Sequence, residues 1–239
     1  MLELLDQLLS YGLFPMALFA GVLTAAAPLE KRKHWQWIAL ACAAGILFLM
    51  LLFSGFIVTF LYHGTIPDQG NAEAWNTVIW CGCLFIAMCL SVLAVCKVSI
   101  AEAMYAACCG YLAEHMSYCT RNLISFFTPV SDGGVLYFLL TAASYFLFYR
   151  FYVRRIVHES HYAKTVLSSL NLSIAILTVV LVMSAFATQY GFVTLHSLYA
   201  LVTGLFVFLS QVNETEKIAA EEILPSASSY GKDRKPSMR

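Results

Sequence analysis

The chain has 239 residues, of which 60% are hydrophobic and only 12% charged, with a mean hydropathy of +0.75. Soluble domains are about half apolar and about a quarter charged, so this chain has too few charges to cover a water-soluble globule of its size. Its 14 basic and 14 acidic residues balance, which gives no reason to expect nucleic acid as a partner. The composition indicates an integral membrane protein whose main partner is the lipid bilayer.

Seven continuously apolar segments follow one another along the chain, at about 8–28, 36–61, 76–96, 98–119, 135–153, 166–187 and 192–212. A helix needs about 20 apolar residues to cross a hydrocarbon core about 30 Å thick. Because the apolar residues run on instead of alternating, helices are favoured over strands. We expect an all-α bundle of seven transmembrane helices. Six helices stay open as an alternative, because the third and fourth segments, and the sixth and seventh, are separated only by short breaks.

Basic residues mark alternate connections between these segments. The first connection contains Lys31, Arg32 and Lys33, the third contains Lys97, and the fifth, within 150–164, contains four more. The second connection has no Lys or Arg, and the fourth has only Arg121. Since cytoplasmic loops are enriched in Lys and Arg, this pattern predicts a multi-pass plasma-membrane protein with its N-terminus outside and its C-terminus in the cytoplasm. That orientation requires an odd number of spans and therefore favours seven.

Ionisable residues interrupt the fourth segment, within the stretch EAMYAACCGYLAEHMSY at 102–118. On a helix, Tyr111, His115, Tyr118 and Asn122 fall on one narrow stripe with Glu114 at its edge, in the outer half of the predicted span. Ionisable groups inside a membrane require partners and often mark function. We treat these five residues as a candidate ligand-binding site, and we leave open the alternative that they only hold helices together.

The remaining polar and sulfur-containing residues predict less chemistry. Glu102 lies near the cytoplasmic end of the fourth segment and is expected to snorkel to the interface or to pair with Lys97. The eight cysteines all lie in or beside apolar runs, where Cys is usually a small buried hydrophobe, so we expect neither a disulfide nor a metal site. His34 and His196 are expected at the membrane interface. The sequence contains no G-x-S-x-G, P-loop or H-E-x-x-H motif, so we expect no cofactor and no enzyme activity.

A family resemblance rests on the same fourth segment. The stretch is similar to the small-residue-rich helix of polytopic sensors of bacterial GHKL-type histidine kinases, in the accessory-gene-regulator-like class. That helix has the approximate pattern A-[LI]-[FY]-x-A-x-x-[GA]-Y-x-x-Q-H. The matching residues here are Ala103, Met104, Tyr105, Ala107, Gly110, Tyr111 and His115, while Glu114 replaces the usual Gln. The resemblance implies six or seven membrane helices, a last helix that leaves the membrane through an acidic segment, and a homodimer.

The resemblance also sets expectations for the domains. We expect a transmembrane sensor-like bundle at 1–212, and a cytoplasmic exit helix with a basic tail at 213–239, with Pro225 ending the helix. Members of the family continue into a phosphoacceptor helix and an ATP-binding domain, and neither is found up to Arg239. We therefore expect this chain not to phosphorylate a partner by itself.

Two functions remain open from the sequence. The first is a signal-input domain that binds an extracellular or membrane-dissolved ligand, either a peptide or a small molecule, and transmits through its last helix to a cytoplasmic kinase. The alternative is a small proton-coupled transporter in which Glu114 and Glu102 carry protons. Missing internal repeats favour the sensor over the transporter.

Overall fold

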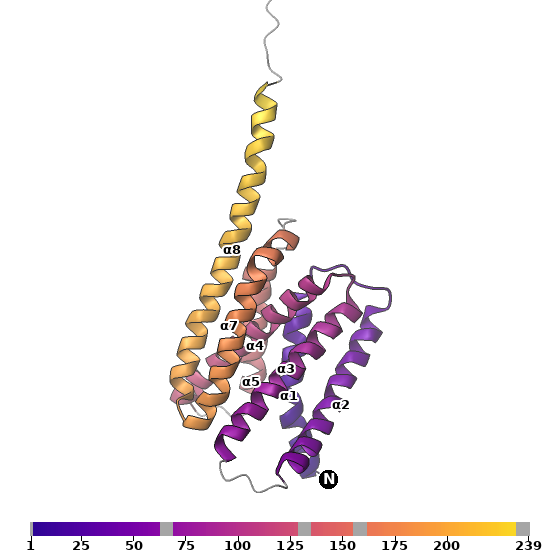
Figure 1. The fold of residues 1–239 in the computed structure, drawn as a ribbon, viewed down its shortest axis with the longest axis vertical. Coiled ribbons are helices and arrows are strands. Elements are labelled where there is room, and N and C mark those ends of the chain that lie inside the picture. The colour runs from indigo at the N-terminus through magenta and orange to yellow at the C-terminus, as the bar shows by residue number, and fades with distance from the viewer. Residues whose placement is uncertain (1, 63–68, 129–134, 155–161, 233–239) are drawn as a thin grey trace, which may run out of the picture.

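The computed structural model describes residues 2–62, 69–128, 135–154 and 162–232. Within these ranges the chain is entirely helical and has no strand. The helices pack side by side into one bundle, and the last helix extends well beyond it (Figure 1). The elements are α1 (Leu2–Ala25), α2 (Trp35–Tyr62), α3 (Gln69–Val95), α4 (Ile100–Phe127), α5 (Val135–Phe148), a short π-helical segment η1 (Tyr149–Val153), α7 (Tyr162–Tyr190) and α8 (Val193–Lys232).

The all-α prediction is confirmed, and a helix overlaps each predicted segment. The helical structure is interrupted at 96–99, between α3 and α4. It is interrupted again at Gly191, which has a φ of +75° and separates α7 from α8. Windows in three of the described helices, Val78–Val95, Leu170–Ala187 and Val193–Glu214, are long and apolar enough to cross a membrane. Parts of three predicted connections, residues 63–68, 129–134 and 155–161, lie outside the described residues, as does the predicted tail from 233 to 239.

Two predicted helix ends are wrong. Helix α4 continues to Phe127 instead of ending near residue 119, and α8 passes Pro225 and ends at Lys232. Hydropathy underestimates the length of α4 because the last turns of the helix are polar. Those turns nevertheless contact partners on other helices. A proline removes one backbone hydrogen bond but has a helix-compatible φ, so it does not by itself stop an otherwise helical segment.

Helix α4 is the central helix of the bundle. It packs against α1, α3, α5, α7 and α8, and every residue from Tyr105 to His115 is buried. The surrounding helices instead present large apolar side chains on the outside, such as Leu40, Ile86 and Phe146. The bundle therefore has its more polar helix inside and its more apolar helices outside, the reverse of a soluble helical protein.

Helices α1 and α4 cross closely because both have a glycine at the crossing. A Cβ atom added to Gly110 would lie 2.5 Å from Val22 Cγ2 and 2.6 Å from the Val22 backbone nitrogen. A Cβ atom added to Gly21 would lie 3.1 Å from the Gly110 carbonyl oxygen. Small residues let helix backbones approach in membrane bundles, so the Gly110 position fixes the distance between these two helices.

The connection after α1 is tied to the connection before α4. Lys31 Nζ donates hydrogen bonds to the carbonyls of Ala26, Ala27 and Leu29 at the end of α1. Burial lowers the pKa of Lys31 because it removes water from the ammonium group. Arg32 reaches across to the end of α3, where its Nε donates to the Cys96 carbonyl at 3.0 Å. Two basic residues of this connection thus satisfy helix-end carbonyls that have no partner within their helix.

Glu102 and Lys97 have different partners from the predicted ones. Lys97 forms a salt bridge with Glu30, whereas Glu102 accepts from the Ser99 backbone N–H at 2.8 Å. The Ser99 hydroxyl in turn accepts from the Glu102 N–H at 3.3 Å, which completes a capping box at the start of α4. The alternative of a Glu102–Lys97 pair is therefore not found, because the S-x-x-E spacing gives the carboxylate a nearer partner at the helix end.

We predict that Gly110→Ala will destabilise the bundle by about 1–3 kcal/mol, because the added methyl group meets the backbone of α1. The measurement is the unfolding temperature of the detergent-purified protein. Gly82→Ala in α3 is the matched control, since a Cβ there meets nothing within 4 Å, and it should leave stability unchanged or slightly raised. Equal unfolding temperatures for the two variants would contradict the close crossing.

Candidate functional site

A buried polar cluster lies where the start of α8 meets the C-terminal half of α4. The turn at Gly191 sends the chain back along the bundle, so the first turn of α8 brings His196 and Ser197 against α4. Their exposed fractions are only 3% and 0%. Polar side chains buried to this degree require hydrogen-bond partners or ligands.

His115 and His196 contact each other inside this cluster. Their Nε2 atoms are 3.2 Å apart, and their rings meet edge to face with centroids separated by 5.4 Å. This distance fits an N–H of one neutral imidazole donating to the lone pair of the other. Cys119 lies one turn after His115 on α4, and the ligand atoms of His115, Cys119 and His196 are all within 4.8 Å of one another.

Glu114 is paired with Arg121 two turns further along α4. Arg121 Nη2 donates to Glu114 Oε1 at 3.5 Å, and its Nε donates to the Ser117 carbonyl at 3.4 Å. The Arg121 guanidinium also lies 5.8 Å from the centre of the Tyr118 ring. Arg121 was predicted in an external connection, but it is 7% exposed, because α4 extends further than its apolar run. The two opposite charges neutralise each other inside the bundle.

The five predicted site residues divide among three directions. Tyr111 turns toward α3, where its hydroxyl donates to the Cys81 carbonyl at 2.9 Å. His115 faces α8, and Asn122 Nδ2 donates to Ser197 Oγ at 3.4 Å. The Tyr118 ring lies beside that of His115, with centroids 5.9 Å apart, while Glu114 pairs along its own helix. The structure therefore brings His115, Tyr118 and Asn122 together but places Tyr111 elsewhere.

Three members of this cluster were not predicted from the sequence. His196 is buried against His115, a contact that its expected position at the membrane interface did not predict. Ser197 follows it, and Cys119 was interpreted only as a small hydrophobe. One signal was present in the sequence: His115 and Cys119 have the i, i+4 spacing that places two ligands on one helix face. The contribution of α8 had no comparable signal.

The two carboxylates that a proton-coupled transporter would use are far apart. Twelve residues separate Glu102 from Glu114 on one helix, which corresponds to about 18 Å. Glu102 caps the start of α4, and Glu114 is bound by Arg121. Each carboxylate is therefore held by a partner of its own.

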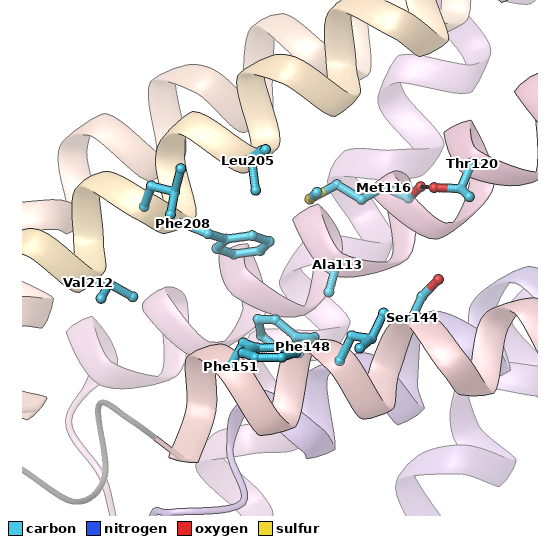
Figure 2. Close-up of a pocket in the computed structure, with 11 residues that line it drawn as sticks. Ala113, Met116, Thr120, Ser144, Phe148, Phe151, Leu205, Phe208 and Val212 are labelled. Carbon is cyan, nitrogen blue, oxygen red and sulfur yellow. Dashed lines mark hydrogen bonds between the residues drawn. The ribbon is translucent and has the colours of Figure 1, made fainter.

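An apolar cavity of about 500 Å³ opens on a different face of α4. Figure 2 shows Phe208 and Val212 of α8 on one side of it and Phe148 and Phe151 on the other, with Ala113 and Met116 of α4 between them. Thr120, Ser144, Leu147, Leu205 and Leu209 complete the lining. Its only polar side chains already bond backbone: Thr120 donates to the Met116 carbonyl at 2.7 Å and Ser144 to the Leu140 carbonyl at 2.8 Å. The cavity thus suits an apolar occupant, and none of the five predicted site residues lines it.

No family model, no curated protein and no solved structure matches this chain. The resemblance to GHKL-type sensors therefore stays an expectation from the sequence motif in α4. In the structure, its matching residues Tyr105, Ala107, Gly110 and Tyr111 are buried. Gly110 permits the crossing with α1, so at least part of the motif has a packing role.

We predict that Glu114→Leu alone will destabilise the protein by about 3–5 kcal/mol, because it leaves the Arg121 guanidinium buried without its carboxylate. Arg121→Met alone should destabilise for the converse reason. The double variant should recover most of the loss, since two apolar side chains of similar volume leave no buried charge. Unfolding temperatures of all four proteins form a double-mutant cycle. Simple additivity of the two losses would show that the pair does not interact.

Proposed function

We propose that this chain is the signal-input domain of a membrane sensor that binds an apolar, membrane-dissolved ligand and transmits through α8. The main support for the proposal is the apolar cavity beside α4, because residues of α8 form part of its lining (Figure 2). A ligand of drug-like size fits a cavity of this volume. A binding site walled by the output helix gives the ligand direct influence over that helix.

Helix α8 is suited to transmission by its length and by its contacts. Its 40 residues span about 60 Å, about twice the thickness of a hydrocarbon core, and it leaves the bundle as a single extension (Figure 1). Among the α8 residues whose burial is described, Gln211 is the last buried one, and its Nε2 donates to Ser173 Oγ of α7 at 2.7 Å. A ligand that packs against Phe208 acts one turn before this contact. It shifts the helix only if it binds two positions of α8 with different affinities.

We propose a multi-pass plasma-membrane protein that is oriented with its N-terminus outside and its C-terminus in the cytoplasm. The α1–α2 and α3–α4 connections, which contain Lys31, Arg32 and Lys97, lie at the end of the bundle from which α8 projects, and α1 begins at the opposite end (Figure 1). The positive-inside rule places that basic end in the cytoplasm. Apolar side chains on the outside of the bundle support a lipid environment. A homodimer follows from the family resemblance and stays part of the proposal.

The transporter alternative has less support. Its two carboxylates have separate partners about 18 Å apart, and the cavity has no titratable lining residue. A proton-driven uptake that is lost in Glu114→Gln would favour the transporter. A sensor requires no such uptake, so proteoliposomes under a pH gradient distinguish the two functions.

We predict that a green fluorescent protein fused after Arg239 will fluoresce in a bacterial host. A periplasmic alkaline phosphatase fused at the same position should be inactive, because the proposed C-terminus is cytoplasmic and the phosphatase requires the periplasm. The two activities are measured in whole cells at equal expression. An active phosphatase and a dark fluorescent protein would reverse the orientation.

We also predict that Ser144→Phe will abolish the ligand response, because the added ring fills the cavity. The readout is autophosphorylation of a chimera in which α8 continues into a GHKL kinase core, in vesicles supplied with a lipid extract of the source membranes. Ala142→Phe is the matched control, since Ala142 is exposed two residues away on the same helix. A normal response in Ser144→Phe, with both variants correctly inserted, would exclude this cavity as the ligand site.

A further inference from the structure

We propose that His115, Cys119 and His196 form a binding site for a single copper(I) ion between α4 and α8. Their ligand atoms lie within 4.8 Å of one another, and all three residues are buried. The site is separate from the apolar cavity used in the proposed function, and the two proposals stand or fall independently.

The geometry of the two histidines already approaches that of a shared ion. In a three-coordinate site, metal–nitrogen bonds of about 2.0–2.1 Å place two imidazole nitrogens about 3.5–3.6 Å apart. The two Nε2 atoms are separated by 3.2 Å, so a movement of a few tenths of an ångström suffices. The Cys119 sulfur lies no more than 4.8 Å from one ring nitrogen of each histidine. A displacement of the sulfur by about 1 Å would bring it within bonding distance of a shared ion.

His196 has few polar contacts in this cluster. Its Nδ1 atom is buried and has no hydrogen-bond partner in the described part of the chain, so the imidazole is bound through Nε2 alone. His196 is held on α8 and His115 and Cys119 on α4, so an ion here would join the two helices.

The charge of the surroundings favours a monovalent ion. Glu114 and Arg121, the charged residues nearest to the cluster on α4, neutralise each other. One thiolate with two neutral imidazoles carries a single negative charge, which copper(I) cancels. Zinc would leave one positive charge in an apolar interior, where a net charge is costly, and would need a fourth ligand such as water. Among the common metals, thiolate ligands favour copper(I) and zinc. The net charge of the occupied site then favours copper(I) over zinc.

The test is an anaerobic titration of the detergent-purified protein with copper(I), in competition with bicinchoninate. We expect one ion per chain, and X-ray absorption of the wild-type complex should show one sulfur and two nitrogen neighbours. Cys119→Ser should weaken copper(I) at least tenfold. Cys108→Ser, which changes another buried cysteine of α4 outside the cluster, should bind as the wild type does.

Three results would overturn the proposal. These are the absence of stoichiometric copper(I), a copper spectrum without a sulfur neighbour, and tighter binding of zinc in a parallel titration with a chromophoric zinc chelator. The wild-type spectrum decides the ligand set even where His115→Ala or His196→Ala fails to fold. Neither the copper nor the zinc titration depends on a signalling response.

Discussion

Burial of α4 inside a surround of five other helices is the constraint on which the rest of the structure depends. The buried middle of a helix in that position has no contact with water, so its polar groups need partners within the protein. It must also have small side chains where the neighbouring helices pack closely against it. The glycine and alanine residues of α4 meet the second requirement, and Gly110 does so most directly by allowing contact with the backbone of α1.

The first requirement explains why the polar residues of α4 occur in pairs with other groups. The carboxylate of Glu114 has Arg121 on its own helix, and the hydroxyl of Tyr111 has a carbonyl of α3. His115 and Asn122 have no such partner on α4 and depend on α8 for theirs. Helix α8 is therefore positioned by polar contacts at its start, while its middle turns border an apolar cavity. In the proposed sensor, an occupant of the cavity would act on α8 beyond these polar contacts.

The ends of the helices follow a different rule, because they lie where the apolar environment stops. Lys31 and Arg32 cover carbonyls at the ends of α1 and α3, and Glu102 closes a capping box at the start of α4. The charged residues that predict the membrane orientation thus also stabilise helix ends. The two roles are compatible, since a side chain that caps a helix end still contributes its charge to that side of the bundle.

The sequence by itself determined the helical class and the positions of the apolar segments, because continuous apolar runs can satisfy their backbone only within a helix. It also showed that Glu114 and His115 needed partners, since the cost of burying them does not depend on the fold. Only the tertiary structure decided who those partners are. Arg121 was not recognised as a partner because α4 extends beyond its apolar run. His196, which contacts His115, lies 81 residues away in the sequence, on another helix. Such a contact depends on how α8 packs across α4, and no local pattern of residues encodes that crossing.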